Sequence, residues 1–272
     1  MDRAGLVGLL RADPASTCLI TDFDGTLAAV VPDPEAARPL PGAAELLAAL
    51  SRRYGRVAVV SGRPAAFLAE HLRAAASGGL GGGPSALRLV GLYGLESVTP
   101  AGQVAAVPEA EPWRAVVTEA ADRAEASAPA GARVERKGLA VTLHWREVPE
   151  HESWATAEAG RLGAELGLIA HPAKMSCELR PPLETDKGKV VAELAAGFAT
   201  VAFLGDDLGD LPAFEALDAL VGAGVRTAKV AVTSPEAPPE LLASADLVLD
   251  GPEEALRLLE ELAQSDSPTA AS

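Results

Sequence analysis

The sequence predicts an α/β protein in which a parallel-sheet core carries an inserted α+β domain. Short apolar runs alternate with helical periodicity over residues 18–91 and again over 188–263, as expected for parallel strands joined by crossover helices. Between these stretches, the pattern changes to paired short strands and amphipathic helices, which is typical of an α+β unit. We therefore expect core segments at 1–107 and 183–263, the insertion at 108–182 and a disordered tail at 264–272.

The core begins with a strand, a helix and a second strand. Residues 18–20 form a short apolar run, 42–54 have Ala and Leu at helical spacing, and 56–60 form the next apolar run. Such a unit is right-handed when its strands are parallel. The other expected core elements are a helix ending near residue 73, strands at 87–91, 200–204, 221–224 and 247–249, and helices at 188–196 and 252–263.

The insertion combines two amphipathic helices with antiparallel strands. The helices are expected at 113–127 and 152–166. Residues 133–146 indicate two strands joined at Lys137-Gly138, and residues 170–179 indicate one further strand. This loosely antiparallel αββ arrangement inside a parallel-sheet protein describes a cap domain.

Composition and charge limit the possible partners. The 272 residues are 49% hydrophobic and 22% charged, as in soluble globular proteins. The net charge of −15 argues against a nucleic-acid partner, whose phosphates attract Lys and Arg. No run approaches the roughly 20 apolar residues that span a bilayer, and the start leaves no room for a signal peptide. Cys18 and Cys177 have no metal-ligand spacing and are expected to be buried free thiols. We expect a cytoplasmic protein with no membrane partner, while the oligomeric state, monomer or higher, stays open.

Two carboxylates follow the first predicted strand. Asp22 and Asp24 lie just beyond it, and Gly25-Thr26 let the backbone turn. Alternation along an extended chain sends both carboxylates the same way, at the edge where open α/β sheets bind ligands. Carboxylates this close repel unless a cation lies between them, and Mg²⁺ suits such oxygen ligands together with a substrate phosphate. The alternative is a helix-capping Asp beside a turn Asp.

Polar groups also follow three later elements of the core. Ser61 could donate a hydrogen bond to a phosphate oxygen, although Ser-Gly is also a common turn. Lys187 precedes a helix whose N-terminus could share that phosphate, although a solvated lysine is the alternative. Asp206, Asp207 and Asp210 follow a buried strand, where three carboxylates would be costly without a cation.

This order of motifs resembles the haloacid-dehalogenase superfamily, whose first motif has the pattern D-x-D-G-T. The resemblance implies a Rossmann-like core in which Asp22 is the nucleophile that attacks phosphorus and Asp24 is the general acid and base. The other implied roles are binding of Mg²⁺ by Asp22, the Asp24 carbonyl and Asp206, binding of phosphate by Ser61, Gly62 and Lys187, and orientation of these groups by Asp207 and Asp210.

A second resemblance, to the trehalose-6-phosphate phosphatases, covers nearly the whole chain. It rests on strings such as Val134-Glu135-Arg136-Lys137, His144-Trp145-Arg146 and Glu178-Leu179-Arg180-Pro181. Alternating acids and bases suit a sugar rich in hydroxyls, although a solvated sheet face with cross-strand ion pairs is the alternative. The side chains that the resemblance places at the sugar are Arg63, Glu96, Glu135, Lys137, Lys174 and Glu178.

The chain departs from that second family at three positions. His is usual where Tyr93 stands, and Thr and Glu are usual where Gly209 and Leu211 stand. No departure removes a catalytic group, so we expect an enzyme that hydrolyses trehalose 6-phosphate to trehalose and phosphate. The alternatives are a phosphatase for another phosphorylated disaccharide or pseudo-disaccharide, a sugar phosphomutase, and a non-catalytic sugar-phosphate sensor. A sensor is disfavoured because all the catalytic groups are present.

Overall fold

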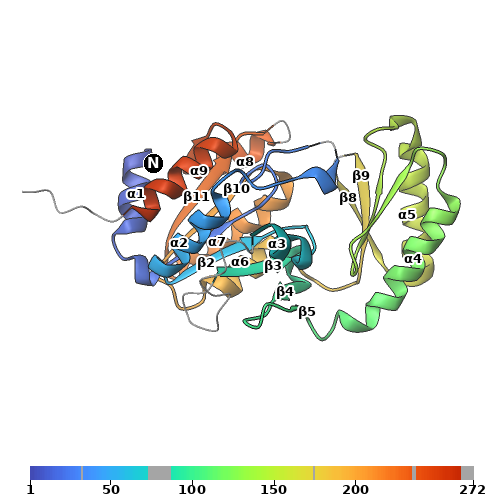
Figure 1. The fold of residues 1–272 in the computed structure, drawn as a ribbon, viewed down its shortest axis with the longest axis horizontal. Helices are drawn as coiled ribbons and strands as arrows, with labels where there is room; N and C mark the ends of the chain where they lie inside the picture. The colour runs from blue at the N-terminus through green and yellow to red at the C-terminus, as the bar shows by residue number, and fades with distance from the viewer. Residues whose placement is uncertain (32, 73–86, 174, 235–236, 265–272) are drawn as a thin grey trace, which may run out of the picture. The chain divides into compact units, whose positions relative to one another are not determined.

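The chain forms two compact units, which are drawn in Figure 1. This computed structural model describes residues 1–31, 33–72, 87–173, 175–234 and 237–264. Unit 1 comprises Met1–Ser61, Ala65–Val104 and Asp186–Ser272, and unit 2 comprises Gly62–Pro64 and Ala105–Thr185. The predicted insertion at 108–182 lies within unit 2. Apart from Gln264, the predicted tail lies outside the described residues.

The larger sheet has eight strands in the order β12-β11-β10-β1-β2-β3-β4-β5. Neighbouring strands from β12 to β3 are parallel, and β4 is antiparallel to β3. The first strand in the sequence is therefore central, between β10 and β2. The strands are β1 (Thr17–Thr21), β2 (Arg56–Val60), β3 (Leu87–Gly91), β4 (Glu96–Val98), β5 (Val104–Ala106), β10 (Thr200–Gly205), β11 (Arg226–Val232) and β12 (Leu247–Leu249).

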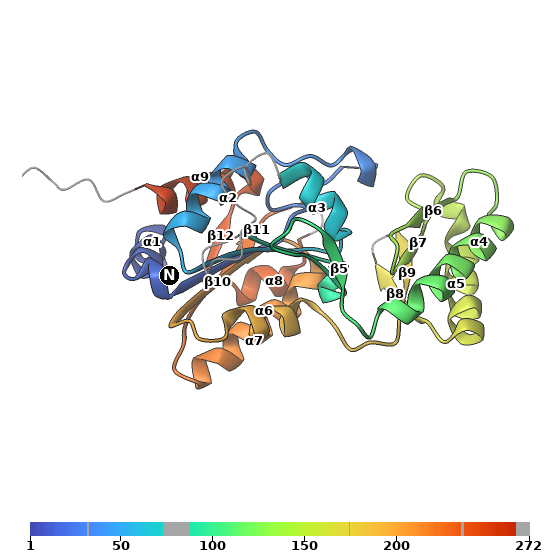
Figure 2. The ribbon, with the colours of Figure 1, turned by 60° about the horizontal axis from the view of Figure 1, so that its bottom comes forward.

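Helices cover both faces of this sheet, as Figure 2 shows. On one face lie α1 (Arg3–Arg11), α2 (Ala43–Arg53), α3 (Ala65–Leu72) and α9 (Gly251–Ala263). On the other lie α6 (Lys187–Ala195), α7 (Leu211–Gly222) and α8 (Pro239–Ser244). Short 3₁₀ turns lie at Pro14–Ser16, Pro34–Ala36, Leu92–Gly94 and Leu208–Asp210.

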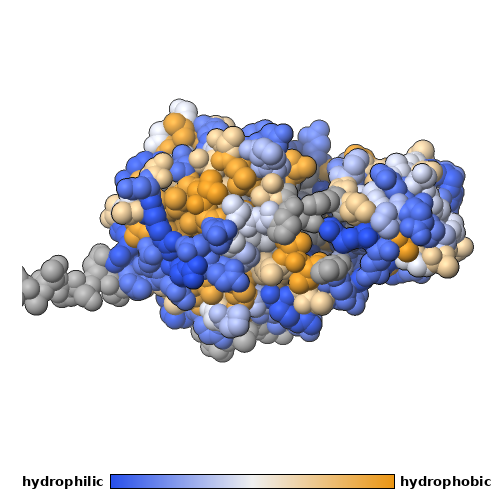
Figure 3. Space-filling model, turned by 90° about the horizontal axis from the view of Figure 1, so that it is seen from above, coloured by the Kyte–Doolittle hydropathy of each residue, from blue (hydrophilic) through white to orange (hydrophobic). Residues whose placement is uncertain are grey.

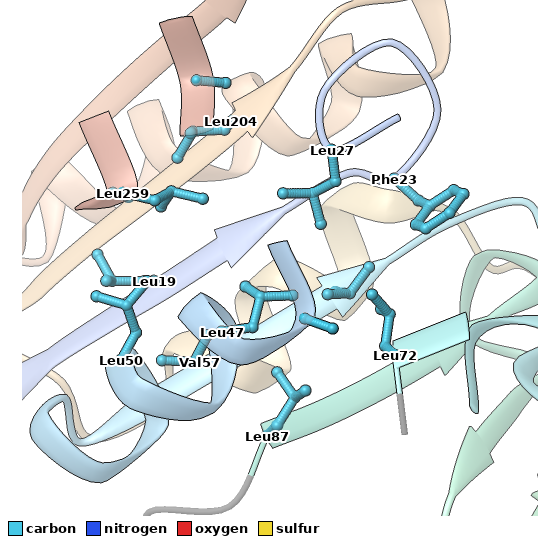
Figure 4. Close-up of a cluster of buried hydrophobic side chains, with 14 of the residues drawn as sticks. Leu19, Phe23, Leu27, Leu47, Leu50, Val57, Leu72, Leu87, Leu204 and Leu259 are labelled. Carbon is cyan, nitrogen blue, oxygen red and sulfur yellow. The ribbon is translucent and has the colours of Figure 1, made fainter. Parts of the chain in front are cut away.

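Strand β1 is buried on both faces, which explains its continuous apolar run. Leu19 points into one core with Leu50 and Val57, as Figure 4 shows, while Cys18 and Ile20 belong to the opposite core. With helices on both sides, β1 and its neighbours are held in one register. The polar residues that follow them therefore meet at the carboxyl edge of the sheet.

Unit 2 contains a four-stranded antiparallel sheet in the order β6-β7-β9-β8. Helices α4 and α5 pack on the face that carries Val141, Leu143, Cys177 and Leu179. The opposite face carries the alternate, mostly polar side chains. The elements are α4 (Arg114–Ser127), β6 (Arg133–Arg136), β7 (Val141–His144), α5 (Glu152–Leu166), β8 (Ile169–Ala173) and β9 (Ser176–Arg180), with 3₁₀ turns at Glu111–Trp113 and Pro149–His151.

The predicted fold class is confirmed, and two local predictions are corrected. Residues 221–224 are the end of α7 and a turn rather than a strand, and the strand lies later, at β11. The single strand expected at 170–179 is two strands, β8 and β9, that pair with each other. Helix α1, which was not predicted, packs against α9 through Arg3, whose guanidinium pairs with Glu254 and Glu261.

The surface mixes charged and apolar side chains, as the face in Figure 3 shows. Within the described residues, no helix is both long enough and apolar enough to cross a membrane. Cys18 and Cys177 are buried and free, as predicted. Burial raises the pKa of the Cys18 thiol to about 12, so this thiol stays protonated at neutral pH.

Candidate active site

Asp22 is placed by the pairing of the two central strands. Its backbone N–H donates to the carbonyl of Leu204 at 2.8 Å, which continues the β1–β10 pairing one residue beyond β1. Asp206 follows β10 in the same way. Both carboxylates are buried, so each needs a charged or hydrogen-bonding partner.

Lys187 supplies the cation for Asp22. It is the first residue of α6, whose N-cap Asp186 accepts a hydrogen bond from the N–H of Lys189 at 2.8 Å. The Lys187 Nζ lies 3.0 Å from Asp22 Oδ1 and 2.6 Å from Asp210 Oδ1. Burial alone would lower the pKa of Lys187, but the carboxylates of Asp210 and Asp22 outweigh it and raise that pKa. The Lys187 ammonium is therefore charged, and it contacts both the carboxylate that follows β1 and the carboxylate of the 3₁₀ turn after β10.

Asp210 holds the end of β10 in place. Its Oδ2 accepts hydrogen bonds from the backbone N–H groups of Asp206, at 2.8 Å, and Asp207, at 3.1 Å. Its Oδ1 accepts from Lys187. Because protein donors already engage both oxygens, Asp210 is suited to orienting its neighbours.

Two glycines let these carboxylates approach the backbone. Gly25 has φ +70°, and a Cβ built there would lie 2.0 Å from Asp206 Oδ2. A Cβ on Gly205 would lie 2.4 Å from the carboxyl carbon of Asp210. The Asp206 carboxylate thus rests against the turn that follows Asp22, where a side chain would displace it.

The clustered carboxylates fit a bound cation. Asp22, Asp206 and Asp210 each offer an oxygen within 4.8 Å of the others. Burial and the nearby Asp210 and Asp207 raise the pKa of Asp206 to about 8, and burial likewise raises that of Asp210 to about 6. Asp207 Oδ1 is buried without a hydrogen-bond partner among the described residues. The single charge of Lys187 does not balance the charges of these clustered carboxylates. Their hard oxygen donors favour a divalent cation.

Asp24 is not one of the three carboxylates that lie within 4.8 Å of one another. Asp24 is half-buried in the turn after Phe23, whose carbonyl accepts from the N–H groups of Leu27, at 2.8 Å, and Ala28, at 3.0 Å. The Phe23 ring packs edge-on against Phe67 with 5.6 Å between centroids. The three clustered carboxylates are those of Asp22, Asp206 and Asp210. The predicted metal ligands were Asp22, Asp206 and the Asp24 carbonyl.

Ser61 lies at the same sheet edge, directly after β2. It is buried, its N–H donates to the Val90 carbonyl at 3.0 Å, and its own carbonyl accepts from the Tyr93 N–H at 3.1 Å. Tyr93 has φ +56°, a left-handed conformation that this contact holds in place. Gly62 and Arg63 follow Ser61 in the chain but cluster with unit 2.

Glu96 has a structural contact that the sequence did not indicate. Its side chain is buried, and Oε2 accepts a hydrogen bond from the N–H of Ala65, the first residue of α3, at 3.3 Å. A carboxylate at this position satisfies a free N–H of the helix and favours its positive end. This contact ties β4 to α3 within unit 1.

The polar face of the unit 2 sheet gathers three of the predicted sugar ligands, Glu135, Lys137 and Glu178. Lys137 Nζ lies 2.8 Å from Glu178 Oε1 and 3.6 Å from Glu135 Oε2. His144 Nε2 lies 2.8 Å from Glu135 Oε2. Burial alone would raise the pKa of Glu178, but Lys137 and Arg180 lower it to about 2, so this carboxylate is ionised. Lys174 lies outside the described residues.

Comparison with known proteins identifies the family. A family model described as trehalose-phosphatase matches residues 20–241. The chain belongs to the trehalose-phosphatase family. A trehalose-phosphate phosphatase of Mycolicibacterium paratuberculosis is 34% identical over 223 residues, which cover 78% of this chain and 54% of that protein. This member of the trehalose-phosphatase family thus spans about half the length of that curated relative.

Solved structures share the fold of this trehalose-phosphatase family member. An Aspergillus fumigatus trehalose-6-phosphate phosphatase is 25% identical, with 97% of each chain covered and a TM-score of 0.62. The C-terminal domain of a Candida albicans trehalose-6-phosphate phosphatase is 22% identical, again with 97% of each chain covered, and has a TM-score of 0.72. At 22% identity, the likeness to the Candida albicans domain supports the fold alone. A Bacteroides thetaiotaomicron protein, described among phosphatases of the haloalkanoate (HAD) enzyme superfamily, is 18% identical, with 90% of this chain and 94% of that chain covered, and its TM-score of 0.52 supports the fold alone.

Proposed function

We propose that this chain is a Mg²⁺-dependent phosphatase that hydrolyses trehalose 6-phosphate to trehalose and phosphate, a step of trehalose biosynthesis. The observation that carries the proposal is the contact of Lys187 with Asp22 beside the Asp206 carboxylate at one sheet edge. Membership of the trehalose-phosphatase family supports the same activity. We also propose that the enzyme acts in the cytoplasm on this small-molecule sugar phosphate.

In the first step, a carboxylate oxygen of Asp22 forms a bond to phosphorus as the bond from phosphorus to the sugar oxygen breaks. Asp24 gives a proton to the departing sugar oxygen. In the second step, Asp24 takes a proton from a water molecule that attacks the aspartyl-phosphate, which releases phosphate and restores Asp22.

The surrounding groups bind and orient the phosphate. The Lys187 ammonium neutralises one phosphate oxygen, and Ser61 with Gly62 donates hydrogen bonds to another. Asp22, the Asp24 carbonyl and Asp206 would hold Mg²⁺, which when bound offsets the negative charge of phosphate and carboxylates. Asp207 and Asp210 orient these ligands and Lys187, consistent with the hydrogen bonds of Asp210 to the backbone of residues 206 and 207.

The polar face of unit 2 provides sugar contacts in this proposal. Glu135 and Glu178 accept hydrogen bonds from sugar hydroxyls, and Lys137 donates to them. Lys137 and Arg180 keep the Glu178 carboxylate ionised and able to accept. Arg63 and Lys174 remain proposed ligands of the same substrate. Glu96, whose carboxylate also contacts α3, remains a proposed ligand of the sugar.

Phosphate release from a panel of sugar phosphates tests the proposal. The panel contains trehalose 6-phosphate, glucose 6-phosphate and another phosphorylated disaccharide, each with Mg²⁺ and with EDTA. We expect Mg²⁺-dependent release with a preference for trehalose 6-phosphate, and a loss of about 1,000-fold or more in Asp22→Asn. Asp218→Asn, at an exposed acid paired with Lys229, is the matched control and keeps wild-type activity. Equal activity of Asp22→Asn refutes the nucleophile, and preference for another sugar refutes the substrate.

A further inference from the structure

The sheet of unit 2 aligns four polar side chains in one row. Glu135 on β6 pairs with Thr142 on β7, Thr142 with Glu178 on β9, and Glu178 with His171 on β8. Residues directly opposite each other in an antiparallel sheet project from the same face, with Cβ atoms about 5 Å apart. His171 therefore extends the row of Glu135 and Glu178 by one strand.

The neighbours of His171 confirm which face it occupies. Ala170, the preceding residue, packs against the core beneath α4 and α5, so His171 points to the opposite, polar face. Ile169 and Arg180 form the next pair along β8 and β9 on that polar face. The His171 side chain is half-buried, and β8 is an edge strand of this sheet.

The hydrogen-bonding capacity of His171 is not used by the residues that the structure describes. Its imidazole forms no hydrogen bond with any residue of the described chain segments, whereas Thr142 and Lys137 both donate to Glu178 Oε1. Neither ring nitrogen is a buried atom that lacks a partner, so both can exchange a hydrogen bond to water for one to a ligand hydroxyl. Burial and the nearby Arg180 lower the pKa of His171, so the ring is neutral at pH 7 and offers one donor and one acceptor.

We propose that His171 is a further substrate-binding residue, which exchanges hydrogen bonds with a sugar hydroxyl at the β8 end of this row. This inference rests on the proposed function, since it names the sugar of the same substrate. It differs from the roles of Glu135, Lys137 and Glu178 because a neutral imidazole both donates and accepts. A sugar hydroxyl does the same, so one hydroxyl can satisfy either ring nitrogen.

Two substrates distinguish sugar binding from a structural role. Trehalose 6-phosphate carries the sugar, whereas p-nitrophenyl phosphate offers the same phosphate without hydroxyls. We expect His171→Ala to raise KM for trehalose 6-phosphate about tenfold, with kcat/KM for p-nitrophenyl phosphate within about twofold of wild type. His171→Gln, whose amide also donates and accepts, should recover most of the affinity. His151→Ala is the matched control, because His151 is a half-buried histidine of unit 2 that contacts the Ala130 carbonyl instead.

The outcomes separate this inference from the proposed function. If the wild-type protein does not release phosphate from trehalose 6-phosphate, the proposed function fails and the inference fails with it. If the wild type is active and His171→Ala keeps its KM, only the inference fails. An equal loss on both substrates, or a loss that His171→Gln does not relieve, shows a structural role and also overturns the inference. Thermal unfolding of each variant identifies such a structural loss directly.

Discussion

The Lys187 ammonium lies 3.0 Å from Asp22 Oδ1, so the first residue of α6 neutralises the carboxylate that follows β1. The same ammonium contacts Asp210 at 2.6 Å, and Asp210 holds the backbone after β10. One buried cation thus joins three segments that are far apart in the sequence. Removing it would leave two buried carboxylates without their partner.

Lys187→Met is therefore expected to reduce both stability and activity. The free energy of unfolding should fall by about 3–5 kcal/mol in EDTA, because the substitution leaves Asp22 and Asp210 buried without a cation. Phosphate release should fall at least about 100-fold. Urea unfolding and a phosphate assay measure the two effects. Lys229→Met is the control, since its partner Asp218 is exposed and such pairs contribute less than about 1 kcal/mol. Equal costs for the two substitutions would contradict the assigned role of Lys187.

Gly25→Ala should remove activity by displacing Asp206. A Cβ at Gly25 would lie 2.0 Å from Asp206 Oδ2, a distance that requires the carboxylate to move. We expect loss of phosphate release and of the rise in melting temperature on adding Mg²⁺. Gly42→Ala separates this clash from backbone strain, because Gly42 has φ +84° but nothing within 4 Å of its added Cβ. Gly42→Ala should cost about 1–2 kcal/mol of stability while activity stays unchanged. Equal activities of the two variants would count against the close approach of Asp206.

Asp206 should make the metal-free protein less stable as pH rises. Its pKa is about 8 in the folded chain against 3.8 as the reference, so between these values the folded chain binds more protons than the unfolded chain. Relative to Asp206→Asn, the free energy of unfolding of the wild type should therefore decrease as the pH rises from about 4 to 8. The slope should be up to about 1.4 kcal/mol per pH unit. Urea unfolding in EDTA measures this slope.

Mg²⁺ should reverse that trend. A cation binds the ionised carboxylate, so the stabilisation of the wild type by Mg²⁺ should grow as pH rises over the same range. An equal ionic strength of NaCl is the control for screening. If the stability difference between wild type and Asp206→Asn in EDTA stays constant across this pH range, the Asp206 carboxylate is ionised without a metal.

Glu178→Gln should weaken sugar binding without affecting phosphoryl transfer. The neutral amide cannot form ion pairs with Lys137 and Arg180, and it replaces one acceptor oxygen with a donor. We expect KM for trehalose 6-phosphate to rise at least about tenfold, with p-nitrophenyl phosphate hydrolysis unchanged. Glu165→Gln, on the helical side of unit 2 where Glu165 pairs with Arg161 and Arg123, is the control. A loss on both substrates would instead indicate damage to the fold.

Much of the fold follows from local patterns. The apolar runs at β2, β3 and β12 were predicted with the bounds that the structure has. In β2 the run is continuous because four of its five residues are buried. Strand β11 was missed because Arg226 and Lys229 interrupt its apolar pattern, and Lys229 reaches Asp218 on α7 instead of entering the core. Strands β8 and β9 were merged because their turn at Met175, with φ +55°, has neither Gly nor Pro to mark it.

By itself the sequence determined the fold class, the family resemblance and the polar residues at the strand ends, because periodicity and motif spacing are local properties of the chain. Only the tertiary structure decided that Lys187 bridges Asp22 and Asp210, that Asp206 rests against Gly25, and that His171 lines up with Glu178. These relationships depend on strand order and register, which packing between distant segments sets. A shift of one residue between β8 and β9 would turn His171 to the other face without changing any motif.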